Sequence, residues 1–372
     1  MKIIYYMPFK ALDHPTPSGD LIIGRGIFAH LSKEHQLEVA SSLRLRWLYR
    51  RPGLCWACLL EILRITRKYR KESPDIWLSY HSYYKAPDIL GALCSRRLGI
   101  PYLLFQGIYS TKRRKKLSTL PGFLLNRYVL RQANLVITNK RRDYKNLRRL
   151  LPEDRLLYIA PGIYPEAFYP DATARTALRQ SWGVPREGKV IISAAMFRPD
   201  VKSEGIKRVI ASMITLKAAG KKFLLVLIGD GLCREELEAY ARPLEDQVIF
   251  MGRIERNEIY RYFSAADLFI FPGIHEALGM VYLEAQSCGL PVIAYGDWGA
   301  GEAVIDGETG LLSSAQEPEQ MTNNITYLLE HDDIRRKMGK NAQAHIRCHH
   351  DIEKNYAILS ETLEKYRKAS AS

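Results

Sequence analysis

Short runs of aliphatic and β-branched residues alternate with longer amphipathic stretches along nearly the whole chain. This alternation is typical of βαβ units, in which helices connect the parallel strands of a sheet. The expected strands form a first series over 2–7, 37–41, 76–80, 101–105, 134–138 and 156–160, and a second series over 189–194, 223–228, 247–251, 267–271 and 291–295. The pattern therefore predicts an α/β protein with two doubly wound parallel sheets.

Proline and glycine cluster between the two series, from about residue 161 to 187, as they do in interdomain linkers. After about residue 315 the pattern indicates helices only. A chain of 372 residues is long enough for two domains. We therefore expect a Rossmann-like N-terminal domain over 1–165, a Rossmann-like C-terminal domain over 166–350, and a terminal helix over 351–372 that packs back towards the N-terminal domain.

The positive charge is concentrated in the first half of the chain. The formal net charge is +15, and residues 1–170 hold 30 Lys and Arg against 12 Asp and Glu. Such an asymmetry favours nucleic acid, an anionic membrane surface or an acidic substrate as a partner of that half. No apolar run reaches the length of a membrane helix. The six cysteines lack regular spacing, which indicates a reducing compartment and a cytoplasmic protein.

The segment 271–291 leads from an expected strand through a loop into a helix. Unpaired N–H groups and the positive dipole end make the start of a helix a candidate phosphate cradle. Glu276 lies in the loop before this helix and Glu284 about one turn into it, so both carboxylates can face one crevice at the carboxyl end of the strand. Two carboxylates beside an anion site suit the binding of sugar hydroxyls. The backbone of the candidate cradle comes from Gly279, Met280 and Val281.

The spacing of Glu276 and Glu284 resembles the E-x7-E signature of retaining GT-B glycosyltransferases of family 4, the glycosyl transferases of group 1. The resemblance continues through 227–231, 250–253, 262–269, 299–302 and 306–312, and through a linker-like segment over 160–170. It implies the GT-B fold, in which two Rossmann-like domains face a central cleft. It also implies a hexosyltransferase-like enzyme that moves a sugar from a nucleotide sugar to an acceptor with retention of the anomeric configuration.

The resemblance implies roles for single residues. Glu284 would hold the ribose hydroxyls of the nucleotide and Glu276 the hydroxyls of the transferred sugar. Lys202 and Arg198 would neutralise the diphosphate as it leaves, and with Glu276 they are the expected catalytic residues. The expected donor-binding residues are Glu284, Gly279, Met280, Val281, Gly229, Gly252, Arg253 and Gly19.

The chain departs from the family pattern at the end of the fourth strand. Many members have a histidine there beside the transferred sugar, whereas this chain has Gln106. An amide cannot serve as a general base but can hydrogen-bond a sugar hydroxyl. His81, which follows the expected strand over 76–80, is the next candidate near the acceptor, and a purely structural histidine at a strand end is the alternative reading.

The expected partners follow from the charge and the resemblance together. No Asp-x-Asp occurs in the chain, so we expect transfer without a metal site or cofactor. A UDP-sugar is favoured over a GDP-sugar as donor. Basic residues interleave with apolar ones over 44–51, 54–71 and 112–125, which is typical of peripheral binding to an anionic membrane. We therefore expect no nucleic acid partner, and an acceptor that is lipid-linked or a cell-surface glycan precursor, at the inner face of the membrane, in cell envelope polysaccharide biosynthesis.

Three other functions are compatible with the sequence. A nucleotide-sugar epimerase or a phosphorylase-like enzyme could share the GT-B fold, although no pyridoxal lysine motif is visible for the latter. A basic, non-catalytic protein that binds a nucleotide sugar or nucleic acid is the alternative outside enzymes. Only a transferase would label an acceptor from a radioactive nucleotide sugar, so this assay separates the alternatives.

Overall fold

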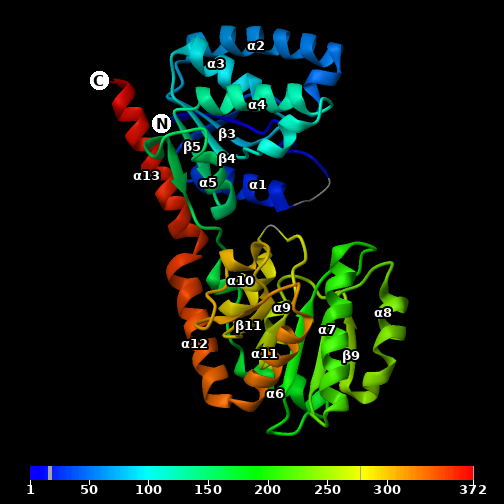
Figure 1. Cartoon of the computed structure of the whole chain (residues 1–372). Helices are drawn as coiled ribbons and strands as arrows, with labels where there is room; N and C mark the ends of the chain where they lie inside the picture. Colours follow the sequence, from blue (N-terminus) through cyan, green and yellow to red (C-terminus); the bar gives the residue numbers. More distant parts are fainter. Residues whose placement is uncertain (16–18, 277, 372) are drawn as a thin grey trace. The chain divides into compact units, whose positions relative to one another are not determined.

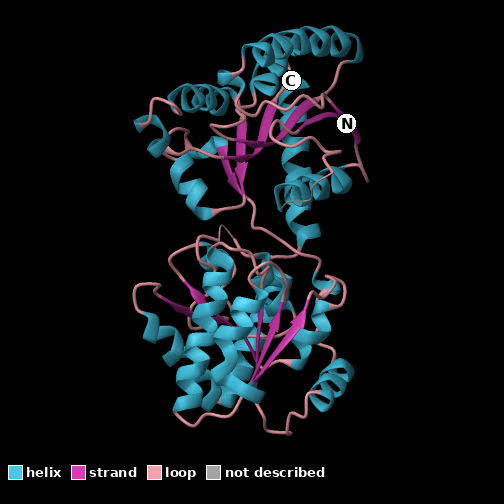
Figure 2. Ribbon diagram, turned by 90° about the vertical axis from the view of Figure 1, so that its right-hand side faces the viewer, coloured by secondary structure: helices cyan, strands magenta, loops and turns pink. Residues whose placement is uncertain are grey.

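The computed structural model describes residues 1–15, 19–276 and 278–371. The chain divides into two compact units, one formed by Met1–Pro161 with Glu353–Ser372 and the other by Gly162–Ile352. The division falls a few residues before the boundary expected between 165 and 166. Within each unit, helices cover both faces of a parallel sheet (Figures 1 and 2). Two such Rossmann-like units in series make this an α/β protein of the GT-B fold.

In the described part of the first unit, one parallel sheet has the strand order β2-β1-β3-β4-β5-β6. Its strands are β1 (Lys2–Tyr6), β2 (Gln36–Val39), β3 (Ile76–Ser82), β4 (Tyr102–Gly107), β5 (Leu135–Thr138) and β6 (Leu156–Tyr158). Its helices are α1 (Gly19–Leu31), α2 (Pro52–Glu72), α3 (Ile89–Leu98), α4 (Leu120–Gln132), α5 (Arg141–Leu147) and α13 (Ile352–Ala371). Short 3-10 turns lie at η1 (Leu48–Arg50), η2 (Thr111–Lys115) and η3 (Glu153–Arg155).

In the described part of the second unit, the parallel sheet has the order β12-β11-β10-β7-β8-β9. Its strands are β7 (Val190–Ala194), β8 (Leu224–Ile228), β9 (Val248–Gly252), β10 (Leu268–Ile270), β11 (Val292–Tyr295) and β12 (Gly310–Ser313). Its helices are α6 (Ala172–Ser181), α7 (Val201–Ala218), α8 (Arg234–Ala241), α9 (Ile259–Ala265), α10 (Met280–Ser287), α11 (Pro318–Glu330) and α12 (Asp332–His349), with 3-10 turns η4 (Pro165–Ala167), η5 (Arg242–Gln247) and η6 (Gly299–Glu302). The sequence pattern missed β12, the edge strand that pairs with β11.

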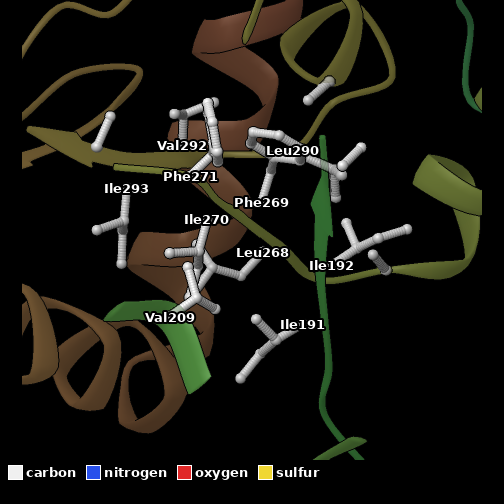
Figure 3. Packing of buried hydrophobic residues seen from close by; sticks show 14 of the residues in the cluster. Ile191, Ile192, Val209, Leu268, Phe269, Ile270, Phe271, Leu290, Val292 and Ile293 are labelled. Atoms are coloured by element: carbon white, nitrogen blue, oxygen red, sulfur yellow. The ribbon is translucent and has the colours of Figure 1, made fainter. Parts of the chain in front are cut away.

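The aliphatic runs become strands because both faces of each sheet are covered. Every residue of β7 is buried, and so is every residue of β8. Figure 3 shows Ile191 and Ile192 of β7 with Ile270 of β10 and Ile293 of β11, against Val209 of α7. Burial of one such side chain contributes about 1.5–3 kcal/mol, which explains why continuous apolar runs identified the strands.

The C-terminal helix α13 packs on the first unit. The Glu353 carboxylate accepts hydrogen bonds from His30 and Lys33 of α1 and its following turn, each at 2.8 Å. The Asn355 amide donates to the carbonyl oxygen of Ala160 at 2.9 Å. These contacts hold α13 against α1 and against the segment that follows β6 in the first unit.

Candidate active site

Two glycines lie at the carboxyl ends of neighbouring strands in the second unit, Gly229 directly after β8 and Gly252 as the last residue of β9. Gly229 has φ 144° and Gly252 has φ 72°, and the Gly229 N–H donates to the Gly252 carbonyl oxygen at 2.9 Å. A Cβ at Gly229 would lie 1.8 Å from the carbonyl oxygen of Ala195, at the end of β7. Only glycine fits where the backbones approach this closely. The edge therefore presents bare backbone, as a nucleotide site at the carboxyl end of a parallel sheet requires.

The loop between β10 and α10 is shaped around the buried ring of Tyr282. The Tyr282 hydroxyl donates to the Phe271 carbonyl oxygen at 3.0 Å. Gly273 and Gly279 both have positive φ, and a Cβ on either would lie within 2.4 Å of Tyr282 atoms. Gly279 is the residue before the helix, so Gly279 and the half-buried Met280 and Val281 of the predicted cradle lie together at the start of α10.

Glu276 and Lys202 form an ion pair at this edge. The Lys202 Nζ lies 3.0 Å from Glu276 Oε1, and about a quarter of each side chain is exposed. Lys202 lies in the first turn of α7, which is capped by the Asp200 carboxylate accepting the Lys202 backbone N–H at 2.8 Å. The fold thus brings together two of the three predicted catalytic residues from two different elements.

The carboxylate of Glu284 lies in an enclosed place on α10. Its side chain is 10% exposed, and Arg256 donates to its Oε1 from Nη2 at 2.8 Å and from Nε at 3.2 Å. Burial raises the pKa of Glu284, and the neighbouring Arg256 guanidinium opposes that rise. Arg253, the predicted donor-binding arginine, is 78% exposed and pairs with Glu255 at 3.4 Å. Arg256, three residues further along the same loop, is the arginine that contacts Glu284.

Arg198 is not joined to the Lys202–Glu276 pair. Its side chain is exposed, and its Nη2 contacts the Met196 sulfur at 3.0 Å. The Ser203 hydroxyl donates to the Arg198 carbonyl oxygen at 2.6 Å, so its backbone is fixed next to the start of α7. Arg198 is near the pair in the fold while its guanidinium points to other atoms.

Two residues at the carboxyl edge of the first unit's sheet have unusual backbone conformations. His81 in β3 has φ 69° and Gln106 in β4 has φ 62°. Non-glycine residues in this left-handed region cost about 1–3 kcal/mol each, and such residues gather at functional sites. Both predicted acceptor-side residues therefore occupy strained positions at the ends of adjacent strands.

The same edge holds buried polar atoms that no described residue satisfies. These atoms are both ring nitrogens of His81, Oε1 of Gln106 and Oδ1 of Asn139. Asp20 Oδ2 lies 3.5 Å from His81 Nδ1, which is too long for a good hydrogen bond, and Asp143 Oδ2 lies 3.5 Å from Gln106 Nε2. Burial lowers the pKa of His81 and raises that of Asp143. Buried groups of this kind need a polar ligand or water.

Two segments named in the sequence analysis are only partly described. Gly19 is the first residue of α1, whereas residues 16–18 before it lie outside the described residues, as does Ala277 beside Glu276. Within the described residues, no group of three or more His, Cys, Asp or Glu side chains is arranged to hold a metal ion. Likewise, none of the described helices is both long and apolar enough to cross a membrane.

Residues 174–345 match the family described as glycosyl transferases group 1. The chain is a glycosyltransferase. It is 27% identical over 318 residues to a D-inositol 3-phosphate glycosyltransferase of Xylanimonas cellulosilytica, covering 79% of this chain and 72% of that protein. It is 26% identical over 359 residues to an alpha-D-kanosaminyltransferase of Streptomyces kanamyceticus, and the match covers 90% of this chain and 89% of that protein. Among solved structures, Anabaena HepE in complex with UDP is similar, with a TM-score of 0.72 and 18% identity over 98% of this chain and all of that one.

Two features of this glycosyltransferase were not found by sequence reasoning. The first is Arg256, because an arginine in a polar loop gives no signal of the side chain it will contact. The second is the involvement of Asn139 and Asp143 in the polar edge of the first unit. Their position just after an expected strand, over 134–138, is the signal that could have found them, because strand ends share one edge of a parallel sheet.

Proposed function

We propose that this glycosyltransferase moves a sugar from a nucleotide-sugar donor to a hydroxyl acceptor with retention of configuration. The observation that carries the proposal is the grouping of Glu276, Lys202 and Glu284 at one strand edge with the start of α10. A helix start attracts the diphosphate, and a carboxylate held at fixed depth can accept hydrogen bonds from two ribose hydroxyls.

Fixed positive charge supports departure of the nucleoside diphosphate. Charge develops on the diphosphate as the bond to the sugar breaks, and preorganised cations stabilise that charge in the transition state. Lys202 is held by Glu276 at 3.0 Å, so its ammonium is already positioned before the donor binds. Arg198 joins it once its exposed guanidinium turns from Met196 towards the phosphates. We propose that these groups act without a metal ion or cofactor.

A front-face mechanism is the proposed route to retention. The leaving phosphate takes the proton of the acceptor hydroxyl as that oxygen attacks the anomeric carbon, so no covalent sugar–enzyme intermediate forms. Glu276 would hold a hydroxyl of the transferred sugar. On the acceptor side, the unsatisfied atoms of His81, Gln106 and Asn139 suit hydroxyl groups, which both donate and accept hydrogen bonds.

The proposed donor is a UDP-sugar in preference to a GDP-sugar. The support is the similar solved structure that binds UDP, HepE. The proposed acceptor is lipid-linked or a precursor of a cell-surface glycan, at an anionic membrane. Its support is the excess of Lys and Arg over residues 1–170 and the basic segment 112–116, followed by Leu117, which is 87% exposed. Cations near anionic lipid contribute about 1 kcal/mol each.

The experiment is a transfer assay with four radiolabelled donors, UDP-glucose, UDP-galactose, UDP-N-acetylglucosamine and GDP-mannose. The acceptor is an extract of membrane lipids. We expect label to move into lipid from a UDP-sugar, to persist in excess EDTA, and to fall sharply in Lys202→Met. The anomeric configuration of the product is read by NMR. Interconversion of free sugar nucleotides without lipid label would indicate an epimerase, and donor binding without any product would indicate a binding protein.

A further inference from the structure

Helix α2 presents an apolar stripe that no other part of the described chain covers. Its inner face buries Cys58, Ile62, Ile65, Thr66 and Tyr69, and it packs beside α3 (Figure 1). On the opposite face, Trp56 is 63% exposed, and Leu60 and Leu63 are 50% and 56% exposed. These residues recur at helical spacing along one line. Exposed tryptophan and leucine in such a line are typical of helices that lie in a membrane interface.

Cations continue the same line over the last two turns of α2. Arg67, Arg70 and Lys71 follow Leu63 on the outward face, and Arg97 at the end of α3 lies beside them. Two neighbouring cations of α2 are paired with carboxylates, Arg64 with Glu61 and Lys68 with Glu38. The four cations of the outward line, by contrast, have no ion-pair partner among the described residues. Apolar and positively charged groups are therefore separated along the helix rather than mixed.

The two halves of the stripe meet in a groove of about 960 Å³. Leu60 and Leu63 supply its apolar lining. Its polar lining comes from the four cations without an ion-pair partner, Arg67, Arg70, Lys71 and Arg97, and from Arg64, Thr66 and Lys68. Among the residues that the structure describes, no aspartate or glutamate lines it. A ligand that fills such a groove carries negative charge at one end and hydrocarbon at the other. An anionic lipid has this chemistry, whereas nucleic acid offers no hydrocarbon chain to the two leucines.

We propose that this groove binds a single anionic phospholipid of the bilayer. Its phosphate lies among Arg67, Arg70, Lys71 and Arg97, its acyl chains lie along Leu60 and Leu63, and Trp56 sits at the level of the headgroups. The groove deepens the proposed function, since it rests on action at a membrane surface and names the element that holds the lipid. Bound in this way, α2 lies parallel to the bilayer and fixes the first unit on it.

The test measures vesicle binding by sedimentation, with phosphatidylcholine vesicles and with vesicles that also contain phosphatidylglycerol. The full chain is compared with the triple variant Arg67→Gln, Arg70→Gln, Lys71→Gln. The matched control loses three exposed cations elsewhere, in Lys222→Gln, Arg242→Gln, Lys340→Gln. We expect the α2 variant to bind anionic vesicles about tenfold or more weakly, given the strength of cation–lipid attraction, and the control to bind nearly like the parent chain.

A second variant separates a discrete lipid groove from diffuse charge attraction. Leu60→Gln with Leu63→Gln keeps every cation, so we expect it to retain the salt-sensitive part of binding and to lose the part that survives high salt. Soluble glycerol phosphate at matched phosphate concentration should not displace the vesicles. Equal losses in the α2 triple variant and its control, or equal binding to both vesicle types, would overturn the proposal. So would preferential binding of a short RNA, or a concentration-dependent dimer abolished by the leucine changes.

Nucleoside diphosphate binding is measured on the same variants, because the donor site lies in the second unit. Vesicle binding that depends on α2, in a protein that binds no nucleotide, would leave the groove standing and refute the proposed function. Nucleotide binding in a protein whose vesicle binding does not depend on α2 would refute the groove and leave the donor site of the proposed function standing.

Discussion

Substitution of Glu284 by glutamine should weaken nucleotide binding without lowering the free energy of unfolding, so the two effects of this buried carboxylate can be measured separately. The carboxylate is 10% exposed and is held by Arg256 at 2.8 Å, so it is positioned before a ligand arrives. Two ribose hydroxyls donating to a carboxylate contribute about 1.5–3 kcal/mol over the neutral amide. We therefore expect the dissociation constant for the nucleoside diphosphate to rise by about 10- to 150-fold in Glu284→Gln.

The effect on stability should have the opposite sign or none. Burial raises the pKa of Glu284, so the ionised form is less favourable in the folded chain than in the unfolded chain. A raised folded-state pKa means that the ionised carboxylate destabilises the fold above that pKa, and the destabilisation disappears as pH falls below the unfolded-state value. Glutamine carries no charge at any pH. We expect the free energy of unfolding at pH 7 to be unchanged or higher in the variant.

The assay is titration calorimetry with UDP, together with urea unfolding at pH 7. The matched control is Glu258→Gln, which removes an exposed carboxylate paired with Arg261 at 2.9 Å in the same unit. The control should bind UDP like the parent chain. A folded Glu284→Gln protein with parental affinity would remove Glu284 from the nucleotide site. A marked loss of stability would show that attraction to Arg256 outweighs burial at this position.

Three further perturbations have defined outcomes. Lys202→Met should lower kcat by about 10²–10³-fold with a smaller change in KM, measured by steady-state transfer, because its charge matters most as the diphosphate leaves; a raised KM with unchanged kcat would assign it to ground-state binding. Gly279→Ala should lower the free energy of unfolding by about 1–3 kcal/mol in urea titration, because φ is 73° and the new Cβ would lie 2.4 Å from Tyr282; parental stability would contradict the described loop. Lys189 and Arg335 lower the pKa of Asp332 to about 2, so Asp332→Asn should cost about 1 kcal/mol at pH 7 after solvent screening. That difference should vanish as pH falls through about 2, and its persistence below that pH would refute the assignment.

The strands could be predicted where burial on both faces forces an apolar run. In β7, Val190–Ala194, every position is buried, so the run is uninterrupted and easy to identify. The edge strand β12 differs, because it begins with glycine and ends with serine. Gly310 is required there since a Cβ would lie 2.1 Å from the Val292 carbonyl oxygen. Only Leu311 and Leu312, between the glycine and the serine, are apolar, and both are half-buried, so the apolar run is too short to indicate a strand in the sequence.

The acidic residues of the site could be predicted because local geometry fixes them. Glu276 and Glu284 lie on a loop and the short helix that follows it, so spacing alone brings them to one edge. Arg253 and Arg256 lie in a loop after β9. In a loop, a spacing of three residues does not determine where either side chain points. In the observed loop conformation Arg256 forms an ion pair with Glu284, whereas the side chain of Arg253 is 78% exposed. Such a choice depends on contacts across the unit and not on residue type.

The strained edge of the first unit carries backbone and hydrogen-bonding costs that local propensity does not favour. A left-handed His81 and Gln106 cost about 1–3 kcal/mol each, and each buried polar atom without a partner costs a further 1–3 kcal/mol or so. Glycine at both positions would remove the backbone cost, so folding alone gives no reason for these side chains. Burial lowers the pKa of His81, which favours the neutral imidazole, and a neutral imidazole can accept a hydrogen bond as well as donate one. Gln106 has the same dual capacity without titrating. A ligand that recovers this energy must both donate and accept hydrogen bonds at several neighbouring points, which is the chemistry of a sugar or polyol.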